Sequence, residues 1–259
     1  MALSPDAAYR LAQGVVGHYQ EAEKVLMRRI ARNLAAGIDA PEWAERKLGQ
    51  LRAYRRQAEA LLDDLAKAAR TSVATALSEA YRLGGLAAVA DLSRLGASAA
   101  APLPGLRAIE ALQAQTLGHL LDSHPAILRS TTDVYRSIIA ETSQQVLMGS
   151  MTQREACQAA LDRFAKAGIP AFWDKKGRKW SLETYTNMAM RTACGNAAIQ
   201  GHIDRLQANG LDLVIVTDAH EECPLCRPWE GKVLSIGGLE SRREETPDAT
   251  PPTLEEQPA

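Results

Sequence analysis

The sequence predicts a mainly α-helical protein with long N-terminal helices and a small C-terminal α+β domain, which holds a short sheet of two or three strands. Over most of the first 150 residues, apolar side chains recur every three or four positions, as on one face of a helix. Six of the twelve aromatic residues and all four cysteines lie between residues 156 and 238, and large rings dominate compact cores. The β-branched run 211–217 is typical of a strand.

These observations divide the chain into three parts. We expect residues 1–150 to form a helical arm or bundle and residues 151–237 to form the small α+β domain. Residues 238–259 are rich in acidic residues and proline and contain almost no apolar anchors, so we expect a disordered acidic tail.

Composition excludes several classes of protein. The 259 residues carry 30 Lys and Arg against 31 Asp and Glu, a net charge of -1, which argues against a surface wholly devoted to nucleic acid. Four cysteines are too few for a disulfide scaffold, which favours a reducing compartment. The first residues lack the pattern of a signal peptide, and no uncharged apolar run approaches the ~20 residues of a membrane span. We therefore expect a soluble intracellular protein that makes no membrane contact.

Capping signals place the first helix. Ser4 is a good N-cap, and Pro5 fits the first helical position, where its missing N–H costs nothing. An apolar stripe runs from Leu11 to Leu34, and Gly37 is a suitable stop. We expect one helix between these signals.

A second helix is expected from Trp43 through Tyr81, where it would be roughly 60 Å long. Its apolar stripe passes through position 47 or 48, where a lysine and a leucine are neighbours. Gly84 and Gly85 predict a kink, after which the helix resumes through Leu95. A helix of this length is typical of a hairpin, a coiled coil or a docking arm.

Residues 96–105 are a linker of small residues with two prolines, which no helix should cross. Two shorter helices are expected over residues 106–121 and 126–148. Thr152 and Glu155 have the spacing of a capping box, so a further helix should start there and end at Gly168.

The small domain is expected to contain a hairpin, a helix and a second strand pair. Residues 171–180 form the hairpin, with Gly177 supplying its turn. Ser181 caps a helix from residue 182 to about 209, which Gly210 closes. The strand 211–217 is expected to pair with residues 232–236.

One cysteine pair is the strongest chemical signal in the chain. The thiolates of Cys223 and Cys226 are spaced to reach one tetrahedral zinc, and His220 provides a third ligand of a suitable type. The same pair fits a thiol redox protein, although Pro228 and Gly231 argue against the helix that such a motif requires. Reduced thiols in a tight turn are the third interpretation, and all three stay open.

Basic clusters suggest a second kind of site. Lys175, Lys176, Arg178 and Lys179 crowd the tip of the expected hairpin, where they form either a solvated tip or a contact for DNA phosphates. The pairs 28–29 and 55–56, both Arg-Arg, are interpreted as ordinary solvated surface on helices.

Two ordered blocks of sequence resemble a known family. Residues 177–193 (GRKWSLETYTNMAMRTA) and 223–235 (CPLCRPWEGKVLS) are similar to the phage minor capsid, or minor head, proteins related to the Mu F protein. The residues that carry the resemblance are Trp180, Glu183, Thr184, Tyr185, Arg191, Thr192, Trp229, Gly231 and Lys232.

The resemblance implies a structural role and no catalytic residue. It implies a minor capsid protein of a tailed phage or prophage, associated with the portal and active in head assembly, with a further role in DNA packaging or ejection. Its partners would be portal, capsid or scaffold proteins and phage DNA, in an assembly of several copies. The protein would reside in the virion head, assembled in the bacterial cytoplasm, with zinc as the only cofactor to consider.

The two blocks are expected to form one compact unit. Within it, Trp180, Tyr185, Arg191 and Trp229 would organise the packing. An enzyme that uses the Cys223 and Cys226 thiols is the competing class of function.

Overall fold

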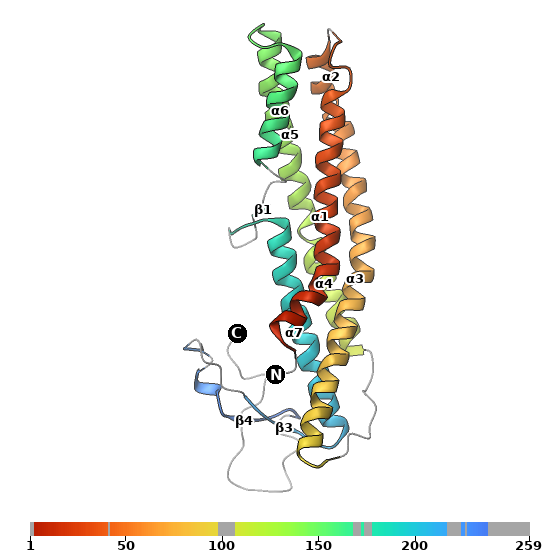
Figure 1. Cartoon of the computed structure of the whole chain (residues 1–259), viewed down its shortest axis with the longest axis vertical. Helices are drawn as coiled ribbons and strands as arrows, with labels where there is room; N and C mark the ends of the chain where they lie inside the picture. The colour runs from red at the N-terminus through yellow and green to blue at the C-terminus, as the bar shows by residue number, and fades with distance from the viewer. Residues whose placement is uncertain are drawn as a thin grey trace.

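The computed structural model describes residues 3–40, 42–97, 107–167, 172–173, 178–216, 224–225 and 227–237. These residues form an elongated helical bundle with two small strand pairs (Figure 1). The mainly helical fold class and the short sheet near the C-terminus are confirmed. The helices are α1 (Pro5–Ala35), α2 (Trp43–Gly49), α3 (Leu51–Arg94), α4 (Arg107–Leu121), α5 (His124–Leu147), α6 (Gln153–Ala167) and α7 (Leu182–Ala208).

The ends of α1 follow the predicted capping signals. The Ser4 hydroxyl accepts a hydrogen bond from the Ala7 backbone N–H at 3.2 Å, with Pro5 in the first turn. Gly37 follows the end of the helix with φ of +67°, a conformation that suits glycine. The local sequence therefore determines where α1 begins and ends.

The second predicted helix is divided in two. The short α2 ends at Gly49, and α3 starts at Leu51 after the junction residue Gln50. With 44 residues, α3 spans about 66 Å and runs along the whole bundle (Figure 1). α3 continues through Gly84 and Gly85 without a break, so the helix does not stop and resume after the predicted kink.

Close contact with α7 explains why α3 carries a glycine at position 84. A Cβ atom placed on Gly84 would lie 1.8 Å from the carbonyl oxygen of Ala198 in α7. A Cβ on Gly201 of α7 would in turn lie 2.0 Å from the carbonyl oxygen of Tyr81 in α3. The two helices therefore cross with their backbones in contact, and only glycine fits at the two positions.

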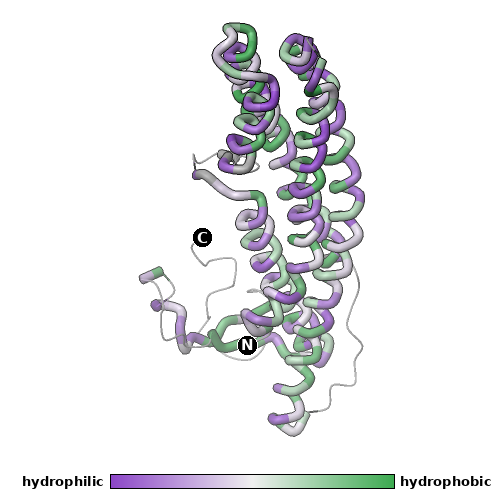
Figure 2. Tube along the Cα trace, turned by 45° about the horizontal axis from the view of Figure 1, so that its top comes forward, coloured by the Kyte–Doolittle hydropathy of each residue, from purple (hydrophilic) through white to green (hydrophobic). Residues whose placement is uncertain are grey.

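Two hydrophobic cores follow one another along the bundle. Hydrophobic and hydrophilic residues alternate along the helices, as amphipathic packing requires (Figure 2). One core joins α1, α3, α4, α5 and α7 around Tyr19, Leu77 and Leu120. The other joins α1, α2, α3, α5 and α6 around Trp43, Tyr135 and Phe164. Both cores contain residues from each side of position 150, where the sequence predicts a domain boundary.

His124 and Pro125 form the first turn of α5, two residues earlier than the predicted start. The Nε2 atom of His124 lies 3.1 Å from the Tyr19 hydroxyl of α1, and the two rings meet edge to face with centroids 5.8 Å apart. Both side chains are buried. This polar pair links α1 to α5 inside the bundle.

Acid is expected to destabilise the fold through His124. Burial lowers the pKa of His124 below its ordinary value of 6.5, and the charge of Asp63 only partly opposes this. The unfolded chain therefore binds a proton that the folded chain excludes, and the free energy of unfolding falls as the pH drops below about 6.5. Burial also lowers the pKa of His202, which lies 3.7 Å from Asp91, so His202 adds to the same loss.

Urea unfolding between about pH 7.5 and about pH 5 tests this expectation. His124→Gln keeps a polar partner for Tyr19 but does not titrate, so its unfolding free energy should change less with pH than that of the unmodified chain. Equal pH dependence in the two proteins would contradict the assignment to His124.

The remaining predicted elements form close to their expected bounds. The Thr152 and Glu155 capping box is present, with the Thr152 N–H donating to the Glu155 carboxylate at 2.9 Å and the Glu155 N–H donating to the Thr152 hydroxyl at 3.3 Å. β1 (Phe172–Trp173) and β2 (Lys179–Trp180) pair antiparallel, with residue 172 opposite residue 180. Gly177, the predicted turn, lies outside the described residues, as does most of the linker 96–105.

The second strand pair lies beyond the far end of α7. β3 (Leu213–Ile215) and β4 (Val233–Ser235) pair antiparallel, with Val214 opposite Leu234. Before them, Gly210 closes α7 with φ of +76°, as predicted. Val214 and Ile236 pack on a small core of Leu92 of α3 and Leu206 of α7 with Ala88. This sheet is therefore attached to the lower end of the bundle (Figure 1).

Candidate functional site

The first block of the family resemblance holds the start of α7 in place. The rings of Trp180 and Tyr185 meet edge to face with centroids 6.0 Å apart, and both pack against the hydrophobic core. The Arg178 guanidinium lies 5.3 Å from the centre of the Trp180 ring, which is a cation–π contact. The Tyr185 hydroxyl donates to the His119 carbonyl at the end of α4, at 3.3 Å. These residues tie β2, α7 and α4 together.

The polar residues of the same block have local structural contacts. The Ser181 hydroxyl accepts from the Thr184 N–H at 3.1 Å, so Ser181 caps α7 as predicted, and it also contacts the Thr184 hydroxyl at 2.7 Å. Gln20 of α1 donates to the Glu183 carboxylate at 2.9 Å. Thr184 therefore contributes to the helix cap, and Glu183 links α7 to α1.

Arg191 and Thr192 lie on the outer face of α7 and are exposed. Together with Met188, they line a shallow depression of about 390 Å³ against Leu3 and Pro5 at the start of the chain. Unlike Trp180 and Tyr185, these side chains are available for contact with another molecule.

The second block forms the turn that leads into β4. Trp229 is half-buried at the end of the short 3₁₀ helix η1 (Arg227–Trp229). Gly231 has φ of +71°, where a residue with a side chain would be strained, and its N–H donates to the Val216 carbonyl at 2.9 Å. The Val216 N–H donates to the carbonyl of Lys232, also at 2.9 Å. The hydrogen bonds of Gly231 and Lys232 with Val216 thus extend the β3–β4 ladder beyond Ile215.

The two blocks do not form one compact unit, so that prediction is wrong. Trp180 precedes α7 and Trp229 follows it, and the 27 residues of this helix span about 40 Å (Figure 1). α7 packs along α1 and α3, and it does not bring the two blocks together. The positions of the two blocks in the sequence do not reveal how far apart they lie in the structure.

The predicted zinc ligands His220, Cys223 and Cys226 lie outside the described residues, so the zinc and redox interpretations stay predictions. Within the described part of the chain, no three His, Cys, Asp or Glu side chains gather closely enough to hold a metal ion. Burial raises the pKa of the Cys194 thiol to about 11 and also raises that of Cys157. Neither thiol is therefore a reactive thiolate at neutral pH.

The predicted DNA contact is described only in part. Lys175 and Lys176 lie outside the described residues, and of Lys179 only the backbone is described. Arg178 is engaged with the Trp180 ring.

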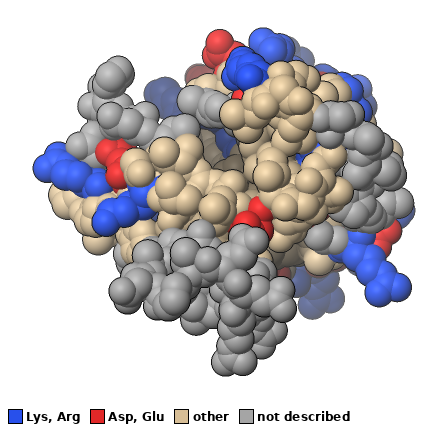
Figure 3. Space-filling model, turned by 90° about the horizontal axis from the view of Figure 1, so that it is seen from below, with Lys and Arg blue, Asp and Glu red and all other residues tan. Residues whose placement is uncertain are grey.

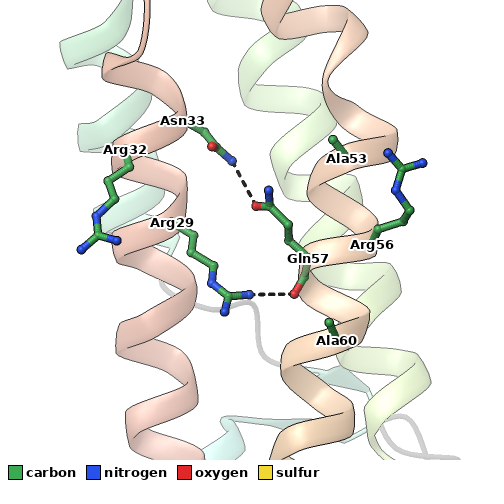
Figure 4. Close-up of a pocket in the computed structure, with 7 residues that line it drawn as sticks. All are labelled: Arg29, Arg32, Asn33, Ala53, Arg56, Gln57 and Ala60. Carbon is green, nitrogen blue, oxygen red and sulfur yellow. Dashed lines mark hydrogen bonds between the residues drawn. The ribbon is translucent and has the colours of Figure 1, made fainter.

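A second arginine-rich region was not recognised as a site in the sequence. Arg29 and Arg32 of α1 and Arg56 of α3 line an open groove of about 540 Å³ between the two helices (Figure 4). Asn33 and Gln57 lie between them, with the Asn33 amide 3.5 Å from the Gln57 side-chain oxygen. The sequence signal for this groove is the Arg-Arg pair in each helix, which by itself predicts ordinary solvated surface.

The β3–β4 pair exposes apolar side chains at the lower end of the bundle. Leu213, Ile215 and Val233 of the β3–β4 pair are exposed there. Seen from below, uncharged atoms make up much of the described surface, with charged side chains at the outline and a few nearer the centre (Figure 3). Among the described helices, none is long and apolar enough to cross a membrane.

A sequence model of the family described as phage minor capsid protein 2 matches residues 3–255, nearly the whole chain. The chain belongs to this family. The resemblance that the two blocks indicated is thereby confirmed, and membership of the minor capsid family places the chain among the structural proteins of phage particles.

One relative of this minor capsid protein is a structural protein of Lactococcus phage LL-H. It is 32% identical over 103 residues, which make up 39% of this chain and 28% of the relative. The chain thus covers less than a third of the relative's length. No solved structure matches the chain.

Proposed function

We propose that the chain is a structural component of the phage head that acts at the portal during head assembly, in several copies, alongside portal, capsid or scaffold subunits. The observation that carries this proposal is the match of the minor capsid family over residues 3–255. The role requires no catalytic residue. It also places the chain in the virion after assembly in the bacterial cytoplasm.

The shape of the bundle supports a role in contacts between subunits. With α3 about 66 Å long, the molecule exposes long helical sides that can reach more than one neighbour in a particle. On the first family block, Trp180 and Tyr185 hold α7 in place, whereas Arg191 and Thr192 face outward. We assign Arg191 and Thr192 to the contact with a neighbouring head subunit.

Particle composition tests the proposal. A tagged copy of the chain, expressed during infection, should co-purify with heads through a density gradient and should cross-link to portal subunits. Absence of the chain from purified heads would reject the structural role, and its presence without portal cross-links would reject the portal location.

Arg191→Glu is expected to reduce incorporation into heads by at least about tenfold, since reversing a charge at an interface places like charges together and costs several kcal/mol. The fold should persist because Arg191 is exposed on α7. Arg136→Glu on the exposed face of α5 is the matched control and should be incorporated normally. Equal incorporation of both variants would show that the outer face of α7 makes no such contact.

A further inference from the structure

The three charged residues that line the α1–α3 groove belong to two short segments of the bundle. Residues 28–33 (RRIARN) and 52–57 (RAYRRQ) contain six arginines and no acidic residue, in a chain whose net charge is -1. They lie on neighbouring helices, α1 and α3, which are in contact. The positive charge is therefore concentrated locally and is invisible in the overall balance.

Five of the six arginines divide into two groups by their partners, and the sixth, Arg52, is exposed and does not line the groove. Arg28 pairs with Glu21 at 3.0 Å, and Arg55 pairs with Glu59 at 2.9 Å, so these two are neutralised. Arg29 reaches across the groove and donates to the Gln57 backbone carbonyl at 2.9 Å (Figure 4). A carbonyl leaves the charge of Arg29 uncompensated.

Arg32 and Arg56 stand on the outer sides of the groove (Figure 4). Within the part of the chain that the structure describes, no acidic group pairs with Arg29, Arg32 or Arg56. Three guanidinium groups therefore line one open groove with no carboxylate among its lining residues. Their arrangement is therefore suited to a ligand that brings negative charge.

The chemistry of the lining selects the class of anion. A guanidinium offers a planar fork of N–H donors that matches phosphate oxygens, and all the cations of this groove are arginines. The carboxamides of Asn33 and Gln57 add neutral donors at its centre. The rest of the lining is Ala53 and Ala60, so the groove offers no exposed ring on which a base could stack.

We propose that this groove binds the phosphate backbone of double-stranded DNA, independently of sequence. A surface that makes no base contacts meets duplex DNA only at its charged backbone. Arginines with no aromatic ring beside them are suited to bind these phosphates. The choice of DNA as the polyanion rests on the proposed function, since a head protein meets the packaged genome. The groove lies on α1 and α3.

The test measures binding of the full chain to a duplex of about 30 base pairs of mixed sequence at several salt concentrations. Replacing Arg29, Arg32 and Arg56 together with glutamine should weaken binding at least about tenfold at low salt. The slope of log K against log salt should become shallower by about 2 to 3, the change expected when three phosphate contacts are lost.

The matched control replaces three exposed arginines elsewhere on the bundle, Arg10, Arg70 and Arg129, with glutamine. It removes the same charge and should keep binding within about twofold, with an unchanged salt slope. Thermal unfolding of both triple variants establishes that they are folded. An equal loss in the two variants, or no loss in the groove variant, would overturn the proposal.

A second arm separates DNA from an acidic protein partner. Polyglutamate is titrated in place of DNA, and saturable binding that depends on the three groove arginines without any binding of DNA would assign the groove to an acidic peptide and overturn the proposal. If the chain enters heads normally but shows no groove-dependent DNA binding, only the proposal for the groove is rejected. If the chain binds DNA through the groove but is absent from heads, only the proposed function in the head is rejected.

Discussion

Replacing Gly84 with alanine is expected to lower the free energy of unfolding by about 3 kcal/mol. The new methyl group would lie 1.8 Å from the Ala198 carbonyl oxygen, far inside the 3.4 Å at which ordinary contact begins. Because the obstacle is backbone within α7, no side chain can rotate away, and α3 and α7 must separate. Separation opens the core on both sides of the crossing, which includes Leu77 and Ala197.

Gly201→Ala should produce a loss of similar size, because its methyl group would meet the Tyr81 carbonyl oxygen at 2.0 Å. The double variant should lose less than the sum of the two single variants, because helices that have already separated accommodate the second methyl group. Urea unfolding followed by circular dichroism measures all three free energies.

Gly195→Ala provides a control in the same helix. Nothing lies within 4 Å of a Cβ at Gly195, so alanine there removes only the helix penalty of glycine and should stabilise the protein by up to about 1 kcal/mol. The predicted effects thus have opposite signs for the same substitution. A neutral or stabilising Gly84→Ala would show that α3 and α7 do not touch at this crossing.

Local signals in the sequence predicted the elements better than their packing. Ser4, Ser181 and the Thr152 capping box each determine a helix start through contacts within four residues, so their signal is complete in a short window. The two strand pairs were likewise found from short runs. The sequence gives no local sign that Gly84 contacts another helix, because that helix, α7, begins about a hundred residues later in the chain.

The α1–α3 groove was missed for the same reason. Arg29 and Arg56 each looked like ordinary helical surface, since each helix by itself also carries acidic residues. Only the pairing of α1 with α3 brings the two arginine segments together and places the nearest acidic residues outside the groove. A site formed by two distant helices has no spacing that a single sequence can reveal.

Lys47 shows a limit of the apolar stripe itself. Both Lys47 and Leu48 fit the predicted helical spacing, and hydrophobicity favours burial of the leucine. The structure instead buries Lys47 and leaves Leu48 45% exposed. The reason is the end of α1, where the Lys47 ammonium donates to the carbonyls of Asn33 and Ala36, the second at 2.8 Å.

Lys47→Ala is therefore expected to lower the free energy of unfolding by about 3 kcal/mol, through a cavity beside the core around Trp43 and two carbonyls that lose their donor. The indole N–H of Trp43, which donates to the Leu34 carbonyl at 2.9 Å, satisfies a different group and cannot replace the ammonium. Lys67→Ala, at a side chain 78% exposed, should change stability by less than about 0.5 kcal/mol and serves as the control.

Lys47→Met distinguishes the hydrogen bonds from the packing. Methionine keeps most of the buried volume and removes the charge, so about 1 to 2 kcal/mol should be lost through the carbonyls alone. Burial lowers the pKa of Lys47, which shows that the site disfavours the ammonium to some degree. A Lys47→Met variant more stable than the unmodified chain would mean that desolvation of the charge outweighs its hydrogen bonds, and the assignment of Lys47 as a stabilising cap of α1 would be wrong.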